Sequence, residues 1–134
     1  MAELPEAVRE LLKKGANVWV ATTSRDGEPN VSVKGCALLD NENLYFADMY
    51  SKKTLENLIY DNRVAVGILS DEDRIAIQVK GVVTLLDEGE LFDRVKKHMD
   101  GLKRNLPPVK YVVRIRVDSV WDMSASPSSG ERLS

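Results

Sequence analysis

The sequence predicts an α+β domain, mainly β, in which antiparallel strands form a barrel or a sandwich and helices lie at its periphery. The chain has 134 residues, which is the length of one ordinary domain. Six segments carry the apolar pattern of β-strands at short spacings. Helical patterns separate only some of them, which argues against a parallel sheet of βαβ units. A closed barrel is favoured, because it would hide the edges of six apolar strands.

The first half of the chain has one helical pattern followed by three strand patterns in meander order. Residues 5–14 are predicted to be helical, because Pro5 suits a first turn and Gly15 can follow the last one. Asp26 and Gly27 favour a tight hairpin turn between the first two strands. The three predicted strands are residues 17–23, 30–39 and 44–47.

The second half has two helical patterns and three strand patterns. The first helix is predicted over residues 51–61, with Ser51 as its N-cap. Its expected apolar side consists of Leu55, Leu58 and Ile59. Gly81 interrupts a long strand and predicts a bulge or a close approach of another chain segment. The predicted strands are residues 63–69, 74–86 and 111–120, and the last helix is predicted over residues 88–105.

Domain organisation is expected to be simple. Residues 1–123 form the predicted domain, and residues 124–134 form a polar tail of small side chains that is predicted to be weakly ordered unless a partner subunit holds it. Trp19 is expected in the core, whereas Trp121 is kept as a candidate ligand contact.

Composition and charge exclude several classes of partner. The formal net charge is -2, so no overall positive field gathers nucleic acid or anionic lipid. No apolar stretch approaches the ~20 residues that span a bilayer, and no secretory signal is evident. The single Cys36 excludes an internal disulfide and a multi-cysteine metal site. We therefore expect a cytoplasmic protein that binds neither nucleic acid nor membrane.

The most informative segment for function is the predicted junction between the strand 44–47 and the following helix. The sequence Ser51-Lys52-Lys53-Thr54 places two hydroxyls, two ammonium groups and free backbone N–H groups around one helix start. Such a point suits a phosphate group. The alternative is a surface helix with two solvated lysines, but lysines in a first turn oppose the helix dipole unless an anion is present.

A second candidate is Lys34, which interrupts an otherwise half-buried strand pattern. This strand adjoins the one that ends at Ala47, so Lys34 reaches the same corner as Lys53 only in one pairing register. Otherwise it is an ordinary outward-facing strand lysine.

Together these segments resemble the FMN-binding split barrels related to pyridoxamine 5'-phosphate oxidase, and among them the small single-domain FMN-binding proteins. The similarity covers roughly residues 16–121. It rests on the segment 20–31, on the Ser-Lys-Lys-Thr junction with the Asn62-Arg63-Val64 that follows it, and on residues 79–83. The resemblance implies a six-stranded antiparallel Greek-key split barrel and a homodimer with FMN at the interface.

The resemblance also implies which residues would hold the cofactor. Lys53 and Thr54 are similar to the phosphate ligands of the family, with Ser51 and Lys52 beside them. The strand segment implied to meet the phosphate and the flavin ring consists of Ser32, Val33, Lys34 and Gly35. Ala47 and Asp48 match the pair at the polar edge of the ring, and Trp121 is a candidate ring contact from the other subunit.

The implied function is an FMN-binding redox protein that transfers electrons or hydride to a small-molecule or protein partner of unknown identity. One alternative is a flavin- or F420-dependent reductase, and another is a cofactor-free interaction module on the same barrel. The family's oxidases end in an Arg-Leu-His-type motif, whereas this chain has Arg132 and Leu133 without a histidine. The resemblance therefore does not extend to pyridoxamine phosphate oxidation.

Overall fold

The computed structural model describes residues 2–35, 38–40, 42–48, 51–101 and 107–134. Three helices and seven strands are found in these parts of the chain. The helices are α1 (Glu6–Lys13), α2 (Lys53–Tyr60) and α3 (Glu90–Gly101). The strands are β1 (Asn17–Thr23), β2 (Pro29–Gly35), β3 (Leu38–Leu39), β4 (Asn43–Asp48), β5 (Arg63–Ser70), β6 (Ile75–Leu86) and β7 (Tyr111–Asp122).

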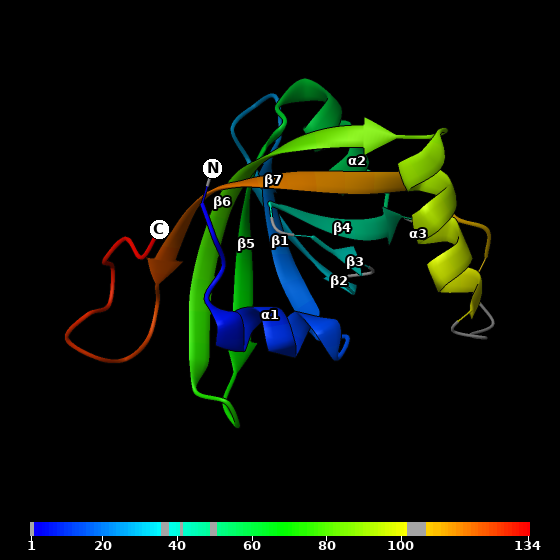
Figure 1. Cartoon of the computed structure of the whole chain (residues 1–134). Coiled ribbons are helices and arrows are strands. Elements are labelled where there is room, and N and C mark those ends of the chain that lie inside the picture. Colours follow the sequence, from blue (N-terminus) through cyan, green and yellow to red (C-terminus); the bar gives the residue numbers. More distant parts are fainter. Residues whose placement is uncertain (1, 36–37, 41, 49–50, 102–106) are drawn as a thin grey trace.

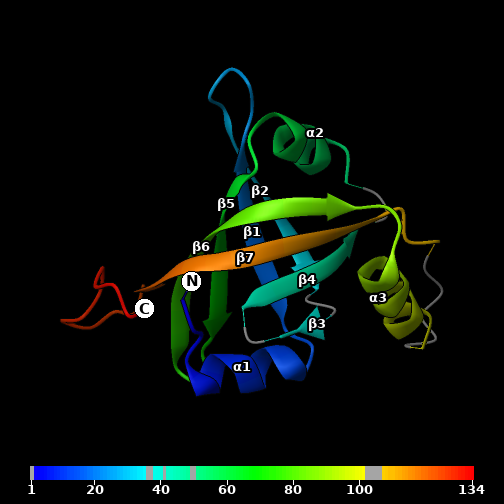
Figure 2. The same cartoon turned by 45° about the horizontal axis from the view of Figure 1, so that its top comes forward.

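All seven strands belong to one antiparallel sheet in the order β2-β1-β5-β6-β7-β4-β3. The sheet curls strongly, as Figures 1 and 2 show, so that its two ends approach each other. An ion pair between Lys34 of β2 and Asp48 of β4 joins these ends, with 3.9 Å between Nζ and Oδ1. The predicted mainly-β split barrel is confirmed.

The predicted strand over residues 30–39 is wrong in one respect, because it is divided between the two ends of the sheet. Its first part, β2, pairs with β1, and its last part, β3, pairs with β4. Residues 36 and 37, Cys36 among them, lie outside the described residues. The chain must pass from one edge of the curled sheet to the other, which one straight strand cannot do.

The main core fills the inside of the curled sheet. Along β1 the side chains of Val18, Val20 and Thr22 point inward and are buried, while their neighbours are exposed. The helix α1 lies across the lower end of the barrel in Figure 1 and adds Val8 and Leu12 to this core. A smaller cluster lies between α3 and the outer side of β4; it contains Tyr45, Ala47, Val95, Val109 and Val112.

Trp19 does not lie in the core, and the prediction that it does is wrong. Its side chain is on the outer face of β1 and is 51% exposed. The reason is the strand period of two, which turns Trp19 outward once Val18 and Val20 face the barrel interior.

Gly81 lies at the predicted irregularity, since the register between β6 and β7 shifts between Lys80 and Gly81. A Cβ atom at this position would collide with the carbonyl oxygen of Arg116 and would lie 2.8 Å from Cγ2 of Ile115. Glycine is therefore required by the close approach of β7.

The C-terminal segment, for which the composition predicts weak order, returns along β7 in the structure. The amide of Leu133 donates to the carbonyl of Val120 at 2.7 Å, and the amide of Asp122 donates to the carbonyl of Glu131 at 2.9 Å. Hydrogen bonds from Ser124 and Ser128 to the carboxylate of Asp122 lower the pKa of that group. None of the described helices is long and apolar enough to cross a membrane.

Candidate functional site

The candidate site lies where β4 ends and α2 begins, beside the edge strand β2. Lys52 is the N-cap residue, and no side chain caps the helix. The prediction that Ser51 is the N-cap is therefore wrong. Instead the backbone amide of Ser51 donates to Oδ1 of Asp48 at 2.8 Å, which ties this segment to the end of β4. The first-turn N–H groups of α2 are left without a side-chain acceptor, and this favours an anionic ligand.

A buried polar network fixes α2 on the inner side of β1 and β2. The hydroxyl of Thr54 is 3.0 Å from that of Ser32 and accepts a hydrogen bond from Asn30 Nδ2 at 3.3 Å. One turn later Asn57 donates to the hydroxyl of Thr22 at 3.0 Å. Thr54 and Asn57 are almost fully buried. Thr54 is therefore already bonded within the protein, and its clearest role is to position the start of the helix.

Lys34 turns toward this same corner. Residues of β2 alternate between two faces, and Lys34 shares the inner face with Ser32. Its side chain is only 15% exposed and forms the ion pair with Asp48 described above. The alternative of an outward-facing lysine is thus wrong, and the register question left open by the sequence is answered.

Asp48 itself is a buried carboxylate with unequal oxygens. Its Oδ1 receives the Ser51 amide and faces the Lys34 ammonium, whereas Oδ2 is buried without a hydrogen-bond partner among the described residues. Its backbone carbonyl accepts a hydrogen bond from the amide of Lys110 at 3.1 Å. A buried oxygen without a donor is unusual and often marks a site that a ligand completes.

The lysines of the helix start differ in their partners. Lys53 is half exposed, and its ammonium is 4.0 Å from the carboxylate of Glu56. For Lys52 no acidic group lies within 4.0 Å among the described residues. The exposed ion pair of Lys53 is weak, so both ammonium groups are available to an incoming anion.

The remaining predicted residues fall on several sides of the site. Val33 points to the outer face of the sheet, and Gly35 lies exposed at the end of β2. The side chain of Ala47 packs under α3 and faces away from the corner. Trp121 follows Tyr111 by ten positions on β7, a distance of about 33 Å along the strand. Within one chain, Trp121 cannot reach a ligand at α2.

Trp121 has its own surroundings at the far end of β7. Its indole N–H donates to the hydroxyl of Ser119 at 2.7 Å. The Lys80 ammonium lies 4.8 Å from the centre of the indole ring and the guanidinium of Arg132 lies 5.9 Å from it. These cation–π contacts hold Lys80 and the C-terminal segment against the ring.

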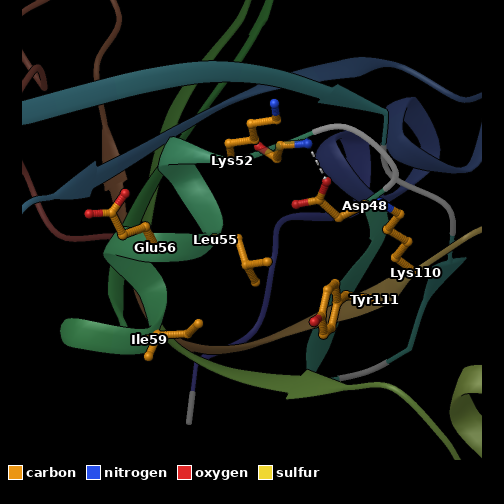
Figure 3. A pocket seen from close by; sticks show the side chains of 8 residues that line it. Asp48, Lys52, Leu55, Glu56, Ile59, Lys110 and Tyr111 are labelled. Atoms are coloured by element: carbon orange, nitrogen blue, oxygen red, sulfur yellow. Dashed lines mark hydrogen bonds between the residues drawn. The ribbon is translucent and has the colours of Figure 1, made fainter.

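The structure also shows a cavity of about 510 Å³ between α2 and the start of β7, which the sequence did not predict. Figure 3 shows its lining, which consists of Asp48, Ser51, Lys52, Leu55, Glu56, Ile59, Lys110 and Tyr111. Leu55 and Ile59 were expected on the buried side of the helix, but Leu58 alone of the three is fully buried. Ile59 is 72% exposed. Sequence periodicity shows which residues share one side of a helix, but it does not show that part of this side is left uncovered.

Comparison with known proteins relates this geometry to one family. Residues 4–124 match the family described as Pyridoxamine 5'-phosphate oxidase. An uncharacterized protein of Methanocaldococcus jannaschii is 30% identical over 129 residues, which cover 92% of this chain and 85% of that protein. A solved FMN-binding protein from Syntrophomonas wolfei is 25% identical with a TM-score of 0.71, over 90% of this chain and 86% of that one.

More distant structures share the fold. HupZ of Group A Streptococcus superimposes with a TM-score of 0.80 at 19% identity, over 95% of this chain and 99% of that one. An F420 reductase gives a TM-score of 0.69 at 21% identity, over 87% and 98% of the two chains. HutZ, the heme storage protein of Vibrio cholerae, gives a TM-score of 0.68 at 17% identity, over 90% of this chain and 95% of that one. The same barrel thus occurs in proteins whose names refer to FMN, F420 and heme.

Proposed function

Because the chain belongs to the pyridoxamine 5'-phosphate oxidase family, we propose that it binds FMN at the corner of β2, β4 and α2 and transfers electrons or hydride through it. The observation that carries this proposal is the convergence of three lysines on one uncapped helix start. Lys34 comes from β2, and Lys52 and Lys53 begin α2. Asp48 and Glu56 offset part of this positive charge. The terminal phosphate of FMN is a dianion and would offset the rest.

Different parts of the corner would bind the phosphate and the flavin ring. The phosphate is held by the N–H groups of the first turn of α2 and by the ammonium of Lys53. Ser32 and Thr54 keep that turn in place through their mutual hydrogen bond. Among the described strands β2 pairs with β1 alone, so the main chain of Val33 to Gly35 has free N–H and C=O groups at the edge for the flavin ring. When bound, the isoalloxazine supplies the redox chemistry.

We propose further that two copies form a dimer that closes the flavin site. The outer face of β2, β1 and β5 is apolar and open, with Val31 61% exposed and Trp19, Val33 and Leu69 also exposed. Trp19 pairs across the sheet with Val33 on one side and Gly67 on the other, so the patch is continuous. Such a face favours burial against a second subunit. A second copy also offers the only route by which a Trp121 ring reaches the site.

The alternative within redox chemistry is an F420-dependent reductase. F420 carries its phosphate as a diester with a single negative charge, whereas FMN carries a dianionic monoester. The three lysines favour the dianion. A module without a cofactor is the remaining alternative, but it would leave Lys52 without an acidic partner among the described residues and the first turn of α2 without an anion. We place the protein in the cytoplasm, where its one cysteine stays reduced.

The test is a comparison of ligands on the purified protein. We expect the flavin absorption bands in the protein as purified, and, after removal of the flavin, FMN binding at least about tenfold tighter than riboflavin binding. Equal affinities would show that the phosphate is not recognised. Binding of F420 without FMN would select the reductase alternative, and binding of neither would select the cofactor-free module. Anaerobic addition of NADH or NADPH then shows whether the bound flavin is reduced.

A further inference from the structure

We infer that Asn30 is a positioning residue for phosphate recognition, because its side chain fixes the direction in which the hydroxyl of Ser32 donates its proton. Asn30 does not itself touch the proposed ligand and acts through two hydroxyl groups, those of Thr54 and Ser32. The inference rests on the proposed function.

The amide nitrogen of Asn30 donates to two buried hydroxyl groups. Its Nδ2 atom lies 3.3 Å from Oγ1 of Thr54 and 3.4 Å from Oγ1 of Thr22. An amide NH2 group carries two protons and acts only as a donor. Each of the two hydroxyl oxygens therefore accepts one proton from Asn30.

The hydroxyl of Thr54 must then donate its own proton to another group. Thr54 is 2% exposed. Besides Asn30, its hydroxyl has one partner among the described residues, which is Oγ of Ser32 at 3.0 Å. A buried hydroxyl proton without an acceptor is costly. The arrangement that satisfies all three groups is the one in which Asn30 donates to Thr54 and Thr54 donates to Ser32.

The hydroxyl of Ser32 ends this hydrogen-bond relay. Its oxygen accepts from Thr54, and its own proton has no acceptor among the described residues. Ser32 is partly exposed, and its partner Thr54 belongs to the first turn of α2. The free proton of Ser32 is therefore available to an anion at the helix start.

The relay also makes Ser32 a better donor. In a chain of hydrogen bonds each donor polarises the next group, so a hydroxyl that accepts a proton donates its own more strongly. Hydrogen bonds to ionised oxygens are the stronger ones, and the phosphate of FMN supplies such oxygens. Riboflavin lacks the phosphate. The relay from Asn30 to Ser32 thus favours FMN over riboflavin.

Asn57 provides a matched comparison, because it belongs to the same buried network and stands outside the relay. It donates to Oγ1 of Thr22 at 3.0 Å and is 1% exposed. No hydrogen bond joins it to Thr54 or Ser32 in the described parts of the chain. If the network only held α2 in place, Asn30 and Asn57 would affect ligand binding in the same way.

The test is a double-mutant cycle on the full chain, in which FMN and riboflavin are titrated into the flavin-free protein and followed by flavin fluorescence. Ser32→Ala removes the donating hydroxyl and should weaken FMN binding by about tenfold. Asn30→Ala should weaken it by about threefold. Riboflavin affinity should stay nearly unchanged in both variants. In the double variant Asn30→Ala should cause no further loss, because the hydroxyl through which it acts is already absent.

Two further variants complete the cycle. Any loss caused by Asn57→Ala should add in full to that of Ser32→Ala, because Asn57 does not act through that hydroxyl. Thr54→Val interrupts the relay at nearly constant volume and should reproduce the loss seen for Asn30→Ala. Asn30 is only half-buried in the edge strand β2, so its variant should fold.

The outcomes separate this inference from the proposed function. A wild-type protein that binds FMN no more tightly than riboflavin would refute the proposed phosphate recognition and the role of Asn30 with it. Tighter binding of FMN by the wild type, together with an unchanged ratio of FMN to riboflavin affinity in Asn30→Ala, would refute the role of Asn30 alone. A loss in Asn30→Ala that adds in full to that of Ser32→Ala would also refute it.

Discussion

Replacing Lys53 by alanine removes one ammonium group from the start of α2. This change should weaken FMN binding and leave the stability of the free protein nearly unchanged. In the free protein the change should be nearly neutral. The lost ion pair with Glu56 is exposed on both sides and 4.0 Å long, so it contributes about 0.2–0.5 kcal/mol. Removing a lysine from a first helical turn gains about 0.3–1 kcal/mol, because the residue opposes the helix dipole. The two effects nearly cancel.

Binding of FMN should respond much more strongly than stability. A charge-assisted hydrogen bond to a phosphate dianion is worth about 1.5–3 kcal/mol, and 1.4 kcal/mol corresponds to a factor of ten. Because the Lys53 side chain is half exposed, we expect the lower end, a loss of about tenfold.

The assay is a fluorescence titration of flavin-free protein with FMN, combined with denaturant unfolding. Lys97→Ala on α3 is the matched control, since that lysine is exposed and far from the helix start. If Lys53→Ala and Lys97→Ala bind FMN equally well while Lys34→Ala does not, the phosphate lies on β2 and the assignment to α2 is wrong.

Three further predictions concern the fold and the assembly. Gly81→Ala should lower the free energy of unfolding by about 1–3 kcal/mol, because the new Cβ meets the Arg116 carbonyl. Gly101→Ala is the control and should not lower it, because the space around Gly101 is open. Denaturant unfolding of the two variants measures the difference. Trp19→Glu should convert a dimer into a monomer by light scattering, and a wild-type monomer with bound flavin would contradict the dimer. Burial and the hydrogen bond to Asp40 raise the pKa of Tyr45 to about 12, from 10.0. The stability that this shift provides is complete below pH 10 and is lost as the pH rises toward 12, so Tyr45→Phe should flatten the alkaline unfolding curve; an unchanged curve would exclude Tyr45 as the cause.

Local patterns determined most of the secondary structure. Apolar alternation located the strands, because a residue's neighbours two positions away share its face of a sheet. The sequence also indicated an irregularity at Gly81, because a glycine inside a strand has few explanations besides a bulge or a close approach. The residue types of the helix start, Ser51 to Thr54, were enough to suggest an anion site, because a helix N-terminus attracts negative charge wherever it occurs.

Only the tertiary structure decided which groups face each other. Lys34 meets Asp48 because the curl of the sheet brings its two ends together, and that curl also divides the predicted strand 30–39 into β2 and β3. Sequence periodicity could not show whether Trp19 or its neighbours would face the interior, since either face of β1 carries apolar side chains. The cavity depends on the packing of α2 against β1 and β2, which leaves Ile59 open beside Tyr111. Contacts of this kind are set by the global arrangement of the strands, and no local pattern encodes them.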